Sequence, residues 1–342
     1  MSESLKLKKE QLDKLVAALL TKYRLFGPVR AGGLTRFAEV ESAEALDLES
    51  SNTTESAKGV FFPQAETLLV YEDGKTEDPA RPVKPIAVFG IRPCDARGLA
   101  MLDKVFGTGK YKDSCWVRRY QDALVISLGC SSPQAGCFCN WLGSSPFDNQ
   151  GSDIACTDTG DVLVLEPCSE KGRGFLENSD GIPFEKPSED DLSKVAEIRN
   201  RVGSSMEEKS DISSIKATLD KSWESPLWDE LAGKCLSCAA CAYLCPTCHC
   251  FDIQDENVPG ASRGRRIRIW DSCMATQFTK EASGYNPRPT GKERLRQRVM
   301  HKFNYFVDVY GEMACVGCGR CIRSCPVNID IRAVIKRFID AG

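Results

Sequence analysis

The chain has 342 residues, of which 42% are hydrophobic, and it carries a formal net charge of -3. This length leaves room for two domains, and the composition excludes a disordered or strongly charged chain. No run of about 18 apolar residues occurs, so no membrane span is expected.

The first stretch, MSESLKLKKEQLDKLVAALLTKY, mixes apolar and charged positions. A secretory signal would need an uninterrupted apolar core, so a cytoplasmic protein is expected. The spacing predicts a first helix that packs on its own domain, in preference to one that lies on a membrane surface. Its apolar face consists of Leu12, Leu15, Val16, Leu19 and Tyr23.

Three apolar runs in the first half, at 85–91, 122–130 and 162–167, predict buried strands. After the first run, Asp95 is expected to cap a helix with Leu99, Leu102 and Phe106 on one face. Strands that alternate with helices predict an α/β fold for an N-terminal domain, which we place at residues 1–168.

Residues 169–229 begin polar and acidic, with glycine and proline, and regain helical patterning around Trp223 and Trp228. We interpret them as a connector that becomes helical. Residues 230–342 are then predicted to form a mainly α domain.

Eighteen cysteines in a chain with no export signal argue against a disulfide framework, because the cytosol keeps thiols reduced. Thiolates in such chains mostly serve metals or redox chemistry. Zinc and iron–sulfur clusters are therefore the two alternatives, and the spacing of the cysteines decides between them.

The stretch KCLSCAACAYLCPTCHC contains the spacing C-x2-C-x2-C-x3-C-P. In this bacterial ferredoxin pattern the first three cysteines bind one cluster and the fourth binds another. A second copy, CVGCGRCIRSCP, follows downstream. Two zinc knuckles would need neither the third cysteine nor the x3-C-P ending, so the spacing favours two [4Fe-4S] clusters. The first is assigned to Cys235, Cys238, Cys241 and Cys325, and the second to Cys315, Cys318, Cys321 and Cys245.

A helix is predicted between the two copies. Thr290 and Glu293 have the spacing of a capping box, and an apolar stripe follows at Leu295, Val299, Phe303 and Phe306. A helical insertion at this place fits the alpha-helical ferredoxin type of dicluster domain.

Residues 230–342 carry 17 Lys and Arg against 11 Asp and Glu, including the stretch SRGRRIR at 262–268. Such a stretch is compatible with nucleic-acid binding, but no nucleic-acid motif or aromatic–basic interleaving accompanies it. We interpret these arginines as offsetting the negative charge of the clusters or binding an acidic partner subunit, and expect no nucleic acid.

Four further cysteines lie on two loops that follow predicted strands. Ligands in α/β domains gather beyond the carboxyl ends of strands, so a third [4Fe-4S] cluster is predicted here. A zinc site with the same ligands, or four structural thiols, are the alternatives. The cysteines are Cys94, Cys130, Cys137 and Cys139.

The six remaining cysteines show no ligand spacing. Cys115, Cys156 and Cys168 are expected to pack as small hydrophobic residues. Cys248, Cys250 and Cys273 are expected to pack beside the cluster loop, with a fourth metal centre or a redox-active thiol pair as alternatives. The two histidines, His249 and His301, are too far apart in sequence to indicate histidine-based catalysis.

Five blocks, in this order, resemble one family: GIRPCDARGLAMLDKVF, GCSSPQAGCFCNWLG, KCLSCAACAYLCPTCHCFD, GYNPRPTGKERLRQRVMHKFNYF and ACVGCGRCIRSCP. It is the dicluster iron–sulfur family of anaerobic sulfite reductases and sulfhydrogenase beta subunits. The resemblance implies an electron-transfer subunit that connects a flavin-bearing, NAD(P)H-oxidising partner with a catalytic or heterodisulfide-reductase-like module. It also implies the eight ferredoxin-type ligands and the four ligands of the third cluster.

An electron-transfer function is the principal hypothesis. No nucleotide-binding glycine fingerprint or P-loop is visible, so the flavin is expected on a partner subunit. One alternative is a catalytic subunit that reduces a disulfide or sulfur compound at Cys248, Cys250 and Cys273. The other is a cluster-containing nucleic-acid-binding protein.

Overall fold

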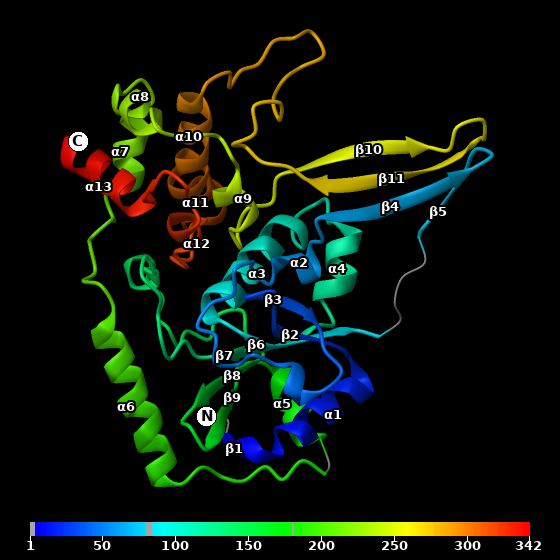
Figure 1. The fold of residues 1–342 in the computed structure, drawn as a ribbon, viewed down its shortest axis with the longest axis vertical. Helices are drawn as coiled ribbons and strands as arrows, with labels where there is room; N and C mark the ends of the chain where they lie inside the picture. The colour runs from blue at the N-terminus through cyan, green and yellow to red at the C-terminus, as the bar shows by residue number, and fades with distance from the viewer. Residues whose placement is uncertain (1–3, 80–83, 180) are drawn as a thin grey trace. The chain divides into compact units, whose positions relative to one another are not determined.

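The computed structural model describes residues 4–79, 84–179 and 181–342 and divides the chain into two units (Figure 1). The first unit comprises Met1–Phe62, Pro82–Lys209 and Val316–Cys318. The second comprises Pro63–Arg81, Ser210–Cys315 and Gly319–Gly342. Each unit is therefore assembled from segments that are far apart in sequence.

Within the described ranges, the first unit is built on a seven-stranded sheet of order β1-β9-β8-β7-β6-β2-β3. Strands β2, β6, β7 and β8 run parallel, and the outer pairs are antiparallel. The three predicted strands correspond to β6, β7 and β9. The strands are β1 (Leu5–Lys8), β2 (Arg24–Ala31), β3 (Leu34–Glu39), β6 (Ile86–Ile91), β7 (Leu124–Leu128), β8 (Ile154–Asp158) and β9 (Val162–Pro167).

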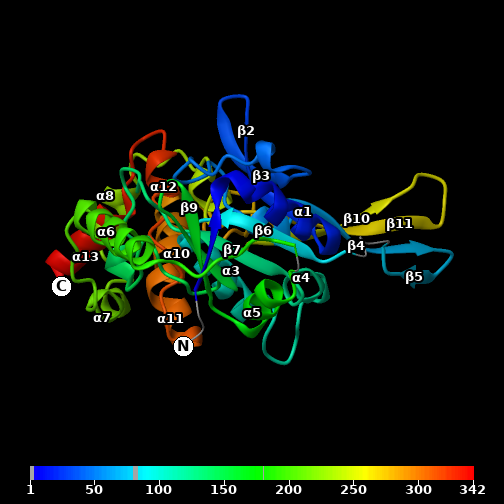
Figure 2. The ribbon, with the colours of Figure 1, turned by 90° about the horizontal axis from the view of Figure 1, so that it is seen from below.

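Helices cover both faces of this sheet (Figures 1 and 2). Helices α3 (Pro93–Phe106) and α4 (Ser114–Tyr120) lie on one face, and α1 (Leu12–Lys22) and α5 (Glu170–Glu177) lie on the other. The short helix α2 (Lys58–Phe61) contacts α3 and α4. Every side chain of β6 and β7 is buried, as expected for parallel strands that are covered on both sides.

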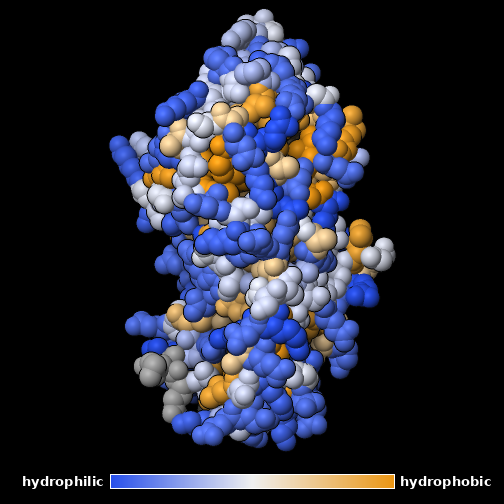
Figure 3. Space-filling model, turned by 90° about the vertical axis from the view of Figure 1, so that its left-hand side faces the viewer, coloured by the Kyte–Doolittle hydropathy of each residue, from blue (hydrophilic) through white to orange (hydrophobic). Residues whose placement is uncertain are grey.

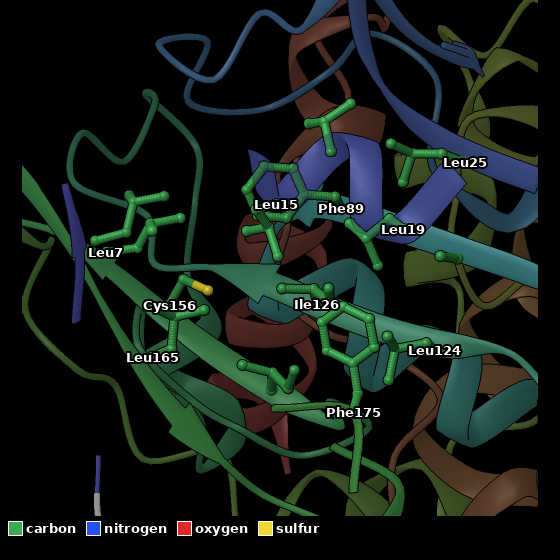
Figure 4. Close-up of a cluster of buried hydrophobic side chains, with 14 of the residues drawn as sticks. Leu7, Leu15, Leu19, Leu25, Phe89, Leu124, Ile126, Cys156, Leu165 and Phe175 are labelled. Atoms are coloured by element: carbon green, nitrogen blue, oxygen red, sulfur yellow. The ribbon is translucent and has the colours of Figure 1, made fainter. Parts of the chain in front are cut away.

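The N-terminal helix packs on its own domain, as predicted. Leu15 and Leu19 of α1 lie in one buried cluster with Phe89, Ile126 and Phe175 (Figure 4). The apolar face of α1 is thus part of the main core of the first unit. On the face of the molecule drawn in Figure 3, hydrophobic side chains lie between hydrophilic ones.

Helix α3 begins differently from the prediction. Arg92 occupies the N-cap position and Pro93 the first helical position, where proline is suited because it has no N–H to leave unpaired. Asp95 is therefore not the cap. It lies in the first turn, is only 1% exposed, and accepts a hydrogen bond from the Ala57 backbone N–H at 3.5 Å. Leu99, Leu102 and Phe106 are buried as predicted.

The segment interpreted as a connector is helical from its beginning. Helix α5 begins at Glu170, and α6 (Glu189–Ser205) follows with a capping box formed by Ser188 and Asp191. The acidic residues of this segment lie in the first turn of α6, where the helix dipole favours negative charge. An acidic, polar stretch here marks a helix start and not a linker.

The helices of the second unit surround the two cysteine-rich loops. Thr290 and Glu293 form the predicted capping box of α10, which continues through a π-helical turn, His301–Tyr305, into α11. The predicted apolar stripe is buried. The helices are α7 (Ile215–Lys221), α8 (Leu227–Ala232), α9 (Ala240–Tyr243), α10 (Gly291–Met300), α11 (Phe306–Tyr310), α12 (Arg320–Arg323) and α13 (Ile331–Ala341). In the part of the chain that the structure describes, no helix is both long enough and apolar enough to cross a membrane.

The second unit also contains a sheet that no local pattern had indicated. Its order among the described residues is β10-β11-β4-β5. The outer strand β10 forms a hairpin with β11, and β11 pairs antiparallel with β4 from a distant part of the chain. The strands are β4 (Ala65–Glu72), β5 (Lys75–Glu77), β10 (Phe251–Asn257) and β11 (Arg263–Trp270).

The arginine-rich stretch 262–268 has a different role from the one inferred from sequence. Arg265 pairs with Glu256 at 2.6 Å and Arg266 with Asp255 at 2.7 Å, both across the β10–β11 hairpin. Arg268 forms a buried ion pair with Glu66 of β4. These three arginines are therefore matched by carboxylates within their own sheet.

Replacing Glu66 by Gln leaves the Arg268 guanidinium buried beside a neutral amide. We expect the free energy of unfolding to fall by about 3–5 kcal/mol, because the buried charge loses its compensation. The control Glu256→Gln removes the exposed partner of Arg265 and should cost about 1 kcal/mol or less. Denaturant unfolding of both variants measures the difference, and equal losses would contradict this account.

Candidate iron–sulfur sites

Both cysteine-rich loops have the same local backbone geometry. In the first loop Ser237 and Ala239 have φ values of 54° and 63°, and in the second Gly317 and Gly319 have 65° and 71°. A four-residue helix follows each loop, α9 and α12 respectively. These left-handed turns are easy for glycine but costly for Ser237 and Ala239, so the first loop carries local strain.

One pocket of the second unit gathers the four predicted ligands of the first cluster. They line it together with Cys321 and Arg298. Most of the remaining wall is apolar, which would keep water away from a bound group. The cysteines are Cys235, Cys238, Cys241 and Cys325, and the apolar residues include Met274, Leu295, Val299, Val327 and Val334.

Backbone N–H groups already point at two of these sulfur atoms. Ser237 N donates to Cys235 Sγ at 3.4 Å, and Ile329 N donates to Cys325 Sγ at 3.2 Å. Hydrogen bonds to sulfur are among the features that tune cluster potentials.

Arg298 tests whether this pocket suits a negatively charged, sulfur-rich group. The side chain is 4% exposed, its Nη1 donates to Cys248 Sγ at 3.5 Å, and its Nη2 has no hydrogen-bond partner among the described residues. Burial alone would lower the pKa of Arg298, but the nearby thiols of Cys241, Cys248 and others raise it well above its usual range. A buried guanidinium N–H without an acceptor is costly, and a cluster sulfide would satisfy it. The residues present therefore fit an iron–sulfur cluster.

Lys302 plays the corresponding part beside Cys245, a predicted ligand of the second cluster. Its ammonium is 1% exposed and donates to Cys245 Sγ at 3.3 Å, to Thr247 Oγ1 at 2.9 Å and to Ala314 O at 2.9 Å. The pKa of Cys245 is held well below its usual range by a hydrogen bond with Cys248 and by the positive charges of Lys302 and Arg298, which outweigh burial. Cys245 is thus prepared to be a thiolate ligand.

The other predicted ligands of the second cluster are divided between the units. Cys315 and Cys321 belong to the second unit, whereas Cys318 lies in the segment Val316–Cys318 that is grouped with the first. Cys315 is close enough to Lys302 to raise the pKa of the lysine, together with Cys245 and against the effect of burial.

The four predicted ligands of the third cluster line one pocket of the first unit, and Gly317 and Cys318 line it as well. Cys94 lies in the first turn of α3, and Cys130 follows β7, so both are at the carboxyl ends of parallel strands. Cys137 and Cys139 complete the set from the loop after Cys130.

Arg92 holds three chain segments together around this pocket. Its guanidinium is buried and donates to the carbonyls of Gly129 and Leu48, each at 2.8 Å, and also to that of Ser50. Burial lowers the pKa of Arg92, although the thiols of Cys130 and Cys94 act to raise it.

The segment Gly317–Cys318 lies directly against the pocket. Phe138 N donates to Gly317 O at 2.8 Å, and Asn52 Nδ2 donates to Cys318 O at 3.1 Å. A side chain at position 317 would place its Cβ 2.4 Å from Cys139 N, so only glycine allows this approach. Asn52 Oδ1 is buried here without a partner among the described residues.

Comparison with known proteins agrees with this geometry. The 4Fe-4S dicluster domain family matches residues 234–329. The chain is 31% identical over 325 residues to the Sulfhydrogenase 2 subunit beta of Pyrococcus furiosus, and the match covers 95% of each chain. The chain belongs to the sulfhydrogenase beta subunit family. It is also 22% identical over 193 residues to the F420-dependent formate dehydrogenase subunit beta of Methanocaldococcus jannaschii, covering 55% of this chain and 42% of that one. No solved structure matches.

These similarities support an iron–sulfur, electron-transfer subunit of an oxidoreductase, as the sequence indicated. The buried cations of this sulfhydrogenase beta family member were not anticipated. Arg294, Arg298 and Lys302 follow one another at intervals of four along α10 and the π-helical turn, beside the apolar stripe. Basic residues in such a register on the buried side of a helix are the signal that would have indicated them.

The remaining cysteines of this family member divide into two groups. Cys115 and Cys156 are buried as predicted, and burial raises the pKa of Cys156. Cys168 is half-buried, with its Sγ 3.2 Å from Glu166 O. Cys248 and Cys250 pack in different places, the first beside Cys245 and the second beside Cys273.

The two histidines are neighbours, although the sequence had suggested that they are far apart. The rings of His249 and His301 lie 5.3 Å apart, centroid to centroid. Burial and the charge of Lys302 lower the pKa of His301 to about 3, so this ring stays neutral. Separation in sequence was therefore a poor guide to their separation in space.

Replacing Lys302 by Met should lower the midpoint potential of one cluster, because the buried cation stabilises the more negative, reduced state. A charge-assisted hydrogen bond contributes about 1.5–3 kcal/mol, which corresponds to a shift on the order of 60–120 mV for one electron. Potentiometric titration followed by electron paramagnetic resonance measures this shift. The control Lys292→Met removes an exposed lysine on the same helix and should leave all potentials unchanged.

Proposed function

We propose that this chain carries electrons through three [4Fe-4S] clusters between a flavin-bearing, NAD(P)H-oxidising partner and a catalytic or heterodisulfide-reductase-like module. The proposal is supported by the dicluster domain match and by relatives that are beta subunits of a sulfhydrogenase and a formate dehydrogenase. Bound clusters would supply one-electron transfer without bond rearrangement.

The ligand sets follow the sequence assignment. We propose that residues 230–342 form an alpha-helical ferredoxin domain, after an α/β domain at 1–168 and a helical connector at 169–229. Cluster 1 takes Cys235, Cys238, Cys241 and Cys325; cluster 2 takes Cys245, Cys315, Cys318 and Cys321; cluster 3 takes Cys94, Cys130, Cys137 and Cys139.

The observation that carries the proposal is the double role of Cys318. Its thiol belongs to the proposed cluster 2, and the same residue lines the pocket of the proposed cluster 3. Its carbonyl accepts a hydrogen bond from Asn52 and lies 3.6 Å from Cys137 Sγ. One residue thereby gives a short route between two cysteine sites, and such contiguity is what a chain of one-electron carriers requires.

Cluster 1 is the end of the chain at which a partner subunit would dock. Cys238 is exposed, and the neighbouring Leu236 is 66% exposed. An apolar side chain beside an accessible ligand is suited to a protein surface that excludes water. The chain's own residues thus hold the charge, with Arg298 and Lys302 inside and Cys238 at the surface.

Iron analysis tests the ligand sets. The anaerobically purified chain should contain about 12 iron atoms, and Cys94→Ser should lower this to about 8, because only cluster 3 loses a ligand. The control Cys156→Ser removes a buried thiol outside the three sets and should leave about 12. A native value of about 8 would remove cluster 3 from the proposal, and zinc in place of iron would overturn all of it.

Reduction kinetics test the direction of the proposal. NAD(P)H alone should not bleach the visible absorption of the clusters, because no nucleotide site is proposed on this chain. Addition of the flavoprotein that co-purifies with the tagged chain should then allow rapid bleaching. Oxidation of NAD(P)H by the isolated chain would contradict the assignment of the flavin to a partner.

A further inference from the structure

We propose that Cys250 and Cys273 form a redox-active dithiol that exchanges an electron pair with the clusters. The inference rests on the proposed electron-transfer function and adds to it a site that holds two electrons at once. The argument comes from the base of the β10–β11 hairpin, the contacts of the two thiols, and their neighbours.

The hairpin brings the two cysteines together. Phe251 pairs with Trp270 in the antiparallel register, and the Asp271 N–H donates to Cys250 O at 3.0 Å. The two chain segments therefore lie about 4.7–4.9 Å apart at this point. Cys273 follows two residues later, so the backbone spacing is of the kind that a disulfide requires.

The thiols themselves are in contact. Cys273 is 9% exposed and packs against Cys250, and the two side chains share a hydrogen bond. Cys248, although only two residues from Cys250, instead packs with Cys245 and accepts a hydrogen bond from Arg298. The pair is therefore Cys250 with Cys273, and Cys248 is excluded from it.

The pair lies beside the proposed cluster 1. Cys235 and Cys241, two of the proposed ligands, pack in the same cluster of side chains as Cys273 and Cys250. The other members of this side-chain cluster are apolar: Ala239, Met274 and Phe278. Electrons could thus pass between cluster and sulfur over a contact distance, while the apolar neighbours shield the pair from solutes.

The chemistry balances with the carriers already proposed. Reduction of the Cys250–Cys273 disulfide breaks one S–S bond, consumes two electrons, one from each of two reduced clusters, and takes up two protons from solvent to give two thiols. The reverse reaction forms the disulfide and reduces two oxidised clusters. Protein disulfides generally have higher potentials than ferredoxin-type clusters, so reduced clusters are able to open the bond.

Such a pair would match carriers of different capacity. Each cluster holds one electron, whereas a flavin that oxidises NAD(P)H delivers two. A dithiol beside cluster 1 allows the chain to store a complete pair next to the end at which Cys238 is exposed.

The test is a redox titration of the full-length, iron-loaded chain under anaerobic conditions. Samples poised with a series of redox buffers are quenched in acid, alkylated and digested, and the peptides are analysed by mass spectrometry. We expect a Cys250–Cys273 cross-linked peptide at oxidising potentials and two alkylated cysteines at reducing ones, with iron content unchanged. Cys168, half-buried in the other unit, should be alkylated throughout.

A second measurement counts electrons. Reductive titration of the oxidised Cys250→Ser variant should consume two fewer electrons per chain than the native protein, and Cys168→Ser should consume the same number. If both cysteines stay alkylatable at every potential in chains with full iron content, or if the electron count is unchanged, the dithiol is ruled out while the electron-transfer function stands. If the native chain binds no iron, the electron-transfer function fails and the dithiol inference with it.

Discussion

Buried positive charge against sulfur is the constraint on which the second unit depends. Burying a cation costs several kcal/mol unless it is paired and hydrogen-bonded. Arg298 and Lys302 are nevertheless almost inaccessible, and their partners are Cys248, Cys245, Thr247 and the backbone of the second cysteine-rich region. Because Lys302 contacts both Cys245 and Ala314, one ammonium group joins the two loops that the ferredoxin pattern requires to meet. The same groups stabilise thiolate, which is the form that binds iron.

A second constraint is the close approach of backbone at Gly317. Three residues of the second cysteine-rich loop are grouped with the α/β unit, because Gly317 lies against Phe138 and Cys139 with no room for a side chain. The cysteine pocket of that unit is therefore completed by a residue nearly 180 positions further along the chain than Cys139. In a protein that carries electrons, this arrangement makes the contact between the proposed carriers a property of the backbone and not of flexible side chains.

The sheet of the second unit shows how local chemistry can mislead. The arginines at 262–268 have the composition of an anion-binding surface, yet Arg265, Arg266 and Arg268 each meet a carboxylate on a neighbouring strand. The acidic partners lie on β10 and β4, and only the strand register reveals the match. The same hairpin places Cys250 beside Cys273 and separates Cys250 from Cys248.

The sequence by itself determined what depends on local spacing. The cysteine patterns, the buried strands β6, β7 and β9, the capping box at Thr290 and the apolar faces of α1 and α10 are all periodic or short-range signals. Each reflects the geometry of a few successive residues, and the structure has these elements at the expected places. Only the tertiary structure decided which distant segments meet: β4 with β11, His249 with His301, Lys302 with Cys245, and Gly317 with Cys139. The reason is physical, since pairing across a long loop is governed by the packing of the whole unit, and the residues on either side carry no local record of their partner.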